Sequence, residues 1–144
     1  FIEVEVVQAV INRVKQVKEN NEEIMITSCF KEISSELADD PNHVKVILDE
    51  HSNAIYFSRA KVPYHRDHHL SSTYSGHLGI YGFTKKSLNA FCKLNPSKLE
   101  NIEKLEQLRA IDNGHKIAMV KVVSKSFGID TQEDLNNAIK IFKK

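Results

Sequence analysis

Five polar side chains occur in two short stretches of the sequence, where they could meet around a ligand: His77, Tyr81, Glu106, Gln107 and Arg109. Imidazole, phenol, carboxylate, amide and guanidinium groups all donate or accept hydrogen bonds. If the two stretches pack together, these groups could form a polar binding site. Whether they converge depends on the elements that carry them.

The first stretch, residues 77–83, has the pattern of a β-strand, with apolar positions at Leu78, Ile80 and Phe83. In a strand, positions 77, 79 and 81 lie on one face, so Gly79 would leave an open floor between the imidazole and the phenol. The alternative is that His77 and Tyr81 are ordinary core residues.

The second stretch begins at Pro96-Ser97, where Ser97 and Glu100 have the spacing of a capping box. Apolar residues at 102, 105, 108 and 111 then predict one amphipathic helix. Such a helix leaves four polar side chains free for other contacts: Glu103, Glu106, Gln107 and Arg109. The alternative is a helix that only covers a buried strand.

The remaining pattern alternates helices and strands. We expect helices over 3–20, over a few residues ending near 37, and from about 131, with strands over 23–29, 44–48, 54–58 and 116–123. The polar segment 49–53 indicates a hairpin, and 61–75 has the composition of a surface loop. We therefore predict one α/β domain, residues 1–144, with a mixed sheet and flanking helices.

The composition argues against some classes of function. The chain has 144 residues, 41% of them hydrophobic and 27% charged, with a net charge of +1, so nothing indicates a nucleic-acid partner. No apolar run reaches the roughly 20 residues of a membrane helix. We expect a cytoplasmic protein without a targeting segment, with Cys29 and Cys92 as free thiols. None of the five glycines forms a phosphate-binding loop.

Three further positions could carry chemistry. Arg59 follows a predicted strand, where ligands often bind in α/β sheets, although it could be a simple surface residue. Asp130 opens the last helix and could be a ligand or, like Thr131, a cap. The run from His65 to His69 contains metal-binding residue types, but adjacent histidines on a loop suit one ion poorly, so we expect a solvated loop.

The segments HLGIYGF, NPSKLENIEKLEQLR, AIYFSRAKVPYHRD and GIDTQEDL together resemble the pattern of 3-deoxy-manno-octulosonate cytidylyltransferases, or CMP-KDO synthetases. These enzymes couple CTP to the eight-carbon sugar acid KDO, releasing pyrophosphate, for lipopolysaccharide biosynthesis. The resemblance implies a nucleotide-diphospho-sugar transferase type of fold, a homodimer and a Mg²⁺ cofactor. The motifs HLGIYG and LEQLR favour KDO over another sugar acid such as sialic acid.

The resemblance also implies roles for individual residues. Arg59 would bind the carboxylate of KDO, Arg109 would support the site, and Asp130 would be a catalytic Mg²⁺ ligand. The sugar hydroxyls would be bound by four side chains: His77, Tyr81, Glu106 and Gln107. The sequence departs from the pattern at Tyr64, where Trp is usual, and at Gln132, where Pro is usual.

The resemblance covers the whole chain but only the C-terminal part of the family's length. We expect the N-terminal nucleotide-binding half to have no counterpart here, and this polypeptide alone not to synthesise CMP-KDO. The chain would then be the sugar-acid-binding and dimerisation part of the enzyme. The alternative is a non-catalytic α/β sugar-binding or interaction domain.

Overall fold

A mixed sheet forms the centre of the computed structural model, which describes residues 2–67, 73–125 and 132–142. In these residues the sheet has five strands in the order β3-β2-β4-β1-β5, with β1 antiparallel to β4 and parallel to β5. The strands are β1 (Ile24–Ile33), β2 (Lys45–Leu48), β3 (Ala54–Ser58), β4 (Tyr74–Gly82) and β5 (Lys116–Lys121). The predicted α/β class and the hairpin between β2 and β3 are confirmed.

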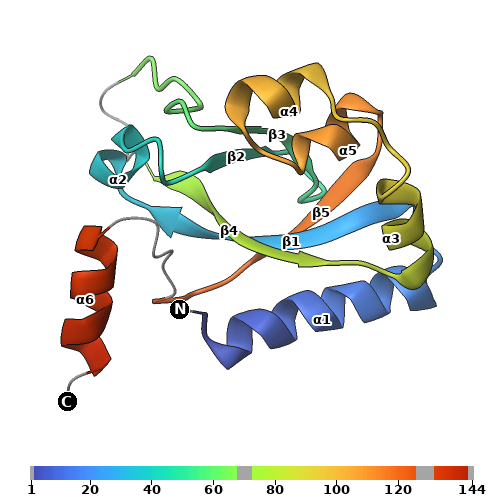
Figure 1. Cartoon of the computed structure of the whole chain (residues 1–144), viewed down its shortest axis with the longest axis horizontal. Coiled ribbons are helices and arrows are strands. Elements are labelled where there is room, and N and C mark those ends of the chain that lie inside the picture. The colour runs from blue at the N-terminus through green and yellow to red at the C-terminus, as the bar shows by residue number, and fades with distance from the viewer. Residues whose placement is uncertain (1, 68–72, 126–131, 143–144) are drawn as a thin grey trace.

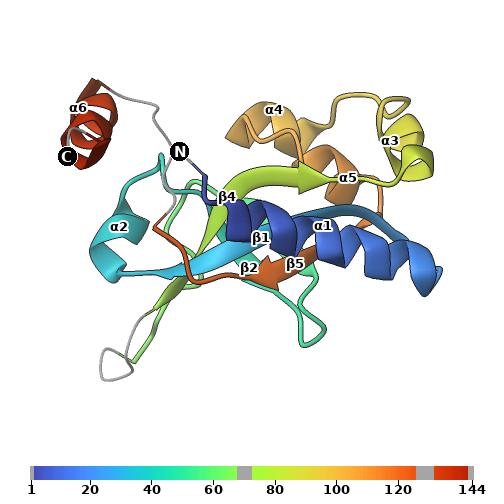
Figure 2. The ribbon, with the colours of Figure 1, turned by 90° about the horizontal axis from the view of Figure 1, so that it is seen from below.

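Helices cover both faces of the sheet. Helix α1 (Val4–Glu19) lies along one face, and α4 (Lys98–Glu103) and α5 (Leu108–Asp112) lie on the other (Figure 1). Figure 2 shows the same layers from below, with α1 in front of the strands. The other helices are α2 (Ser35–Asp39), α3 (Lys85–Phe91) and α6 (Gln132–Phe142). No helix in the described parts of the chain is long and apolar enough to cross a membrane.

Helix α1 packs on the sheet through valines at helical spacing. Val6 and Val10 are buried with Cys29, and Leu78 and Ile80 of β4 pack against this cluster. Gly82 allows the close approach, because a Cβ atom there would lie 2.5 Å from a Val14 methyl group. Alternate residues of β4 therefore face α1, and their neighbours face the opposite side.

The opposite face holds the larger core. Phe57, Leu105 and Leu108 are buried there with Ile26 and Ile117, which fixes α5 and the end of α4 against the strands. Burial of this apolar surface is the main stabilising contribution to the position of the α4–α5 segment. That segment carries the second stretch of candidate residues.

The prediction of one helix after Ser97 is wrong in part. Ser97 and Glu100 do form the capping box, but α4 ends at Glu103, and the next residue, Lys104, adopts a left-handed conformation with φ 55°. A separate helix, α5, starts at Leu108. Strand β4 also starts at Tyr74, inside the segment expected to be a loop, and α3 was not predicted.

Candidate functional site

A bulge in β4 shapes the candidate site. Thr27 pairs with Gly82 and Cys29 with Leu78, so two steps along β1 are matched by four steps along β4. The extra residues make β4 arch away from its partner, as bulges generally do. The arch brings the rings of His77 and Tyr81 within 5.6 Å of each other between centroids.

Gly79 lies between these two residues and leaves open space. A Cβ atom built on Gly79 would meet no atom within 4 Å among the described residues. Leu78 and Ile80 point towards α1, so the open space lies on the opposite face with His77 and Tyr81. The structure therefore contains the open floor that the sequence predicted.

His77 contacts Phe57 and Ser28. Its ring packs edge-on against Phe57 with centroids 4.8 Å apart, and its Nε2 atom lies 2.8 Å from Oγ of Ser28. Burial lowers the pKa of His77 to about 4, because water no longer stabilises the charged form. The imidazole is therefore neutral near pH 7.

Tyr81 joins the strand to the α4–α5 segment. Its hydroxyl donates a hydrogen bond of 3.1 Å to Oε1 of Gln107, which is 3% exposed. Nε2 of Gln107 is buried and has no hydrogen-bond partner among the described residues. Burial, with a smaller effect from the charge of Glu106, raises the pKa of Tyr81 to about 12, so the phenol keeps its proton.

The structure therefore brings four of the predicted residues together. His77, Tyr81 and Gln107 are linked by the contacts above, and the exposed Glu106 is close enough to influence the phenol. A donor amide, a neutral imidazole, a phenol and a carboxylate around an open floor can bind a ligand with several hydroxyl groups.

Arg59 lies at the border of this group, and its guanidinium contacts the main chain. Nε donates 2.8 Å to the carbonyl of Glu103, and the terminal nitrogens donate to the carbonyls of Pro41 and Lys104. Among the described residues, no hydrogen bond or ring contact joins Arg59 to His77 or Gln107. Its predicted role in binding a carboxylate stays a prediction.

The carboxylate of Glu103 contacts the end of β3 and the residue that follows it, Arg59. It accepts hydrogen bonds from the Ser58 hydroxyl at 2.7 Å, the Arg59 amide at 3.0 Å and, more weakly, the Tyr56 hydroxyl. Burial opposes ionisation, but these donors outweigh it, and the pKa of the Glu103 carboxyl lies below its usual value. The end of β3 is thereby fixed to the end of α4.

Arg109 has a structural role in the described residues. Its guanidinium forms two hydrogen bonds with the buried carboxylate of Glu100 and lies over the ring of Phe91, 5.3 Å from the centroid. The pair links the start of α4 to α5, so it holds the segment that carries Gln107. The role that the resemblance implies for Arg109, support of a sugar-acid site, stays a prediction.

The predicted magnesium ligand, Asp130, lies outside the described residues. Within the described parts of the chain, no group of three or more histidine, cysteine or acidic side chains could hold a metal ion. Mg²⁺ can be bound by one or two carboxylates together with phosphate oxygens, so a cluster is not required. The role of Asp130 as a Mg²⁺ ligand therefore stays a prediction.

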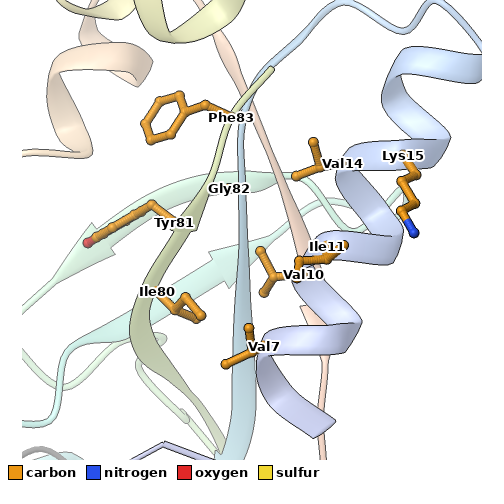
Figure 3. A pocket seen from close by; sticks show the side chains of 9 residues that line it. All are labelled: Val7, Val10, Ile11, Val14, Lys15, Ile80, Tyr81, Gly82 and Phe83. Atoms are coloured by element: carbon orange, nitrogen blue, oxygen red, sulfur yellow. The ribbon is translucent and has the colours of Figure 1, made fainter. Parts of the chain in front are cut away.

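A hollow of about 280 Å³ lies on the opposite face of the strand, between α1 and the end of β4 (Figure 3). In Figure 3 the side chain of Ile80 points towards α1, whereas that of Tyr81 points away from it. Most of the lining is aliphatic: Val7, Val10, Ile11, Val14 and Ile80. Such a lining does not suit a sugar acid, so the polar face above Gly79 is the better candidate.

Sequence reasoning missed one residue of the site, Ser28, which lies opposite the bulge and is fully buried. Glu103 was expected to be free for other contacts, but its partners at Ser58 and Arg59 were not predicted. Ser28 gave no signal, because a serine in a strand reveals its partners only when the pairing of the strands is known.

Comparison with known proteins identifies relatives of the chain. The cytidylyltransferase family model matches residues 1–117. The 3-deoxy-manno-octulosonate cytidylyltransferase of Wolinella succinogenes is 50% identical over 144 residues, covering 99% of this chain and 59% of that protein. The protein of the same name from Helicobacter pylori strain 26695 is 50% identical over 145 residues, covering 99% and 57%.

A solved structure shows the same fold. The structure of CMP:2-keto-3-deoxy-manno-octonic acid synthetase complexed with CTP superposes with a TM-score of 0.79 and 29% sequence identity. The match covers 91% of this chain and 54% of that chain. The present chain thus spans between half and three fifths of the length of these relatives. By its family match, its similar sequences and its fold, the chain belongs to the cytidylyltransferase family.

Proposed function

We propose that this chain is the part of a CMP-KDO synthetase that binds the sugar acid KDO. The observation that carries the proposal is the open face above Gly79, bordered by His77, Tyr81 and the buried amide of Gln107. KDO presents a carboxylate and several hydroxyl groups, which such a polar face can bind. The names of the relatives support this substrate.

In the proposed reaction, the anomeric oxygen of KDO forms a bond to the α-phosphorus of CTP. The bond between the α-phosphorus and the bridging oxygen breaks, pyrophosphate leaves, and the proton of the anomeric hydroxyl is released to solvent. The contribution of this chain is to hold the sugar acid in one orientation, because positioning of two reactants supplies a large part of the rate in such transfers. The nucleotide would be bound by the part of the protein that the relatives have in addition.

Further properties rest on the family resemblance. We infer a homodimer, a cytoplasmic location, and a requirement for Mg²⁺ with Asp130 as a ligand. Sedimentation of the purified protein would test the dimer, and a single species with the mass of one chain would contradict it.

The experiment for the proposed function is titration calorimetry with KDO. We expect saturable binding by the unmodified chain and at least tenfold weaker binding by Gln107→Ala, because a buried hydrogen bond to a ligand is lost. Asn101→Ala is the matched control, since Asn101 is an exposed amide on α4. Absence of binding by the unmodified chain would contradict the proposal and favour a non-catalytic domain with another partner.

A further inference from the structure

Ser28 lies where the bulge in β4 would otherwise leave carbonyl groups without a partner. Its Oγ atom is 2.8 Å from the carbonyl oxygen of Ile80 and 2.8 Å from Nε2 of His77, with the carbonyl oxygen of Leu78 at 3.4 Å. Ser28 has no exposed surface, so water does not compete for these contacts. The one hydroxyl therefore connects β1, the arched backbone and the imidazole.

The direction of these hydrogen bonds follows from the number of protons. A serine hydroxyl has one proton, and a carbonyl oxygen can only accept. If the proton pointed to His77, the oxygens of Ser28 and Ile80 would face each other at 2.8 Å without a proton between them, which is repulsive. The hydroxyl therefore donates to Ile80 and accepts from Nε2–H of His77.

This arrangement sets the form of the imidazole. A neutral imidazole with its proton on Nε2 has an unprotonated Nδ1, which is a hydrogen-bond acceptor. Among the described residues Nδ1 of His77 has no hydrogen-bond partner. Burial, which keeps His77 neutral near pH 7, agrees with this form.

We propose that Ser28 is a positioning residue that holds His77 as the neutral Nε2–H form, so that Nδ1 accepts a hydrogen bond from a hydroxyl group of the sugar acid. The proposal rests on the proposed function for its ligand and deepens it by assigning the direction of one hydrogen bond. A ligand group at this position must be a donor, so a sugar whose hydroxyl is replaced by a methoxy group there would be rejected.

The form of His77 can be measured without any assay of activity. In a long-range ¹H–¹⁵N correlation spectrum of the histidine-labelled chain at pH 7.5, we expect a protonated Nε2 and an unprotonated Nδ1 for His77. The Nδ1 signal should shift when KDO is added. An Nδ1–H form in the free chain, or an unchanged Nδ1 signal at a KDO concentration that saturates the calorimetric titration, would overturn the proposal.

Substitution of Ser28 tests its role. In Ser28→Ala we expect both neutral forms of His77 to be populated and KDO to bind about three- to tenfold more weakly. Thr27→Val is the matched control, because it removes a buried hydroxyl from the adjacent position of β1. An unchanged His77 spectrum in Ser28→Ala would overturn the role of Ser28.

The two proposals fail in different ways. If the unmodified chain does not bind KDO, the proposed function fails, while the spectrum of the free chain still decides the form of His77. If KDO binds but His77 carries its proton on Nδ1, the proposed function stands and the role of Ser28 fails. Should Ser28→Ala not fold, the spectrum of the unmodified chain alone decides.

Discussion

At the scale of single residues, the phenol of Tyr81 links strand β4 to Gln107. Tyr81→Phe removes the hydrogen bond to Gln107 while keeping the ring. We expect KDO affinity to fall about three- to tenfold, because the Gln107 amide loses the partner that orients it. The free energy of unfolding in urea should change by about 1 kcal/mol or less, since Tyr81 is 41% exposed. Unchanged affinity would contradict a role for this link.

The half-buried imidazole of His77 predicts a loss of stability in weak acid. Its pKa is about 4 in the folded chain and about 6.5 in an unfolded one. Between these values the unfolded chain binds a proton that the folded chain does not, so stability is highest above pH 6.5 and falls as the pH approaches 4. From pH 7.5 to pH 5 this residue should account for a loss of about 2 kcal/mol.

Urea unfolding of the unmodified chain and of His77→Gln at the two pH values measures this contribution. Gln does not titrate, so the variant should lose about 2 kcal/mol less stability over the same range. Equal losses in both proteins would show that His77 is accessible to protons in the folded chain. The comparison cancels the contributions of the carboxylates.

At the scale of the elements, the packing of α1 on β4 depends on Gly82. A methyl group there would lie 2.5 Å from Val14 and 2.8 Å from Val10, so Gly82→Ala must push the helix away. We expect a loss of about 1–3 kcal/mol in unfolding free energy, which is the usual effect of overpacking. Combining the change with Val14→Ala should recover part of that loss. Simple additivity of the two changes in urea unfolding would contradict the proposed contact.

The sequence predicted the elements better than their ends. Ser97 and Glu100 predict the start of α4, and the spacing of the valines predicts the buried face of α1. Both patterns depend only on residues that are near neighbours in the chain. The break at Lys104 could not be predicted, since it depends on Glu103 being held by β3. The bulge likewise depends on Ser28 of β1, whose hydroxyl donates a hydrogen bond to β4 about 50 residues later in the chain.

Some features of the candidate site could be predicted from the sequence, and others could not. The residue types at 77, 81 and 107 indicated hydrogen bonding to a polar ligand, and the resemblance supplied the ligand class. The contacts of Arg59 with main-chain carbonyls were not predictable, because two of the carbonyls lie at the end of α4 and the third, that of Pro41, precedes β2. Strand and helix patterns contain no information on such long-range contacts.

At the scale of the whole molecule, the chain spans only 59% of the Wolinella succinogenes protein. We expect the purified chain to release no pyrophosphate from CTP in the presence of KDO and Mg²⁺, because the nucleotide site would lie in the additional part of the relatives. A protein of the relatives' full length is the positive control. Robust pyrophosphate release by this chain would contradict the expectation.

The proposed KDO site depends on one face of strand β4. Gly79→Val would fill the open space above the strand, and it should not lower the melting temperature, because valine suits a β-strand and its Cβ atom would meet no atom within 4 Å. The most direct measurement is calorimetric titration of KDO into this variant. We predict that KDO binding is abolished while the fold is retained. Binding of KDO with unchanged affinity would show that the sugar acid lies elsewhere.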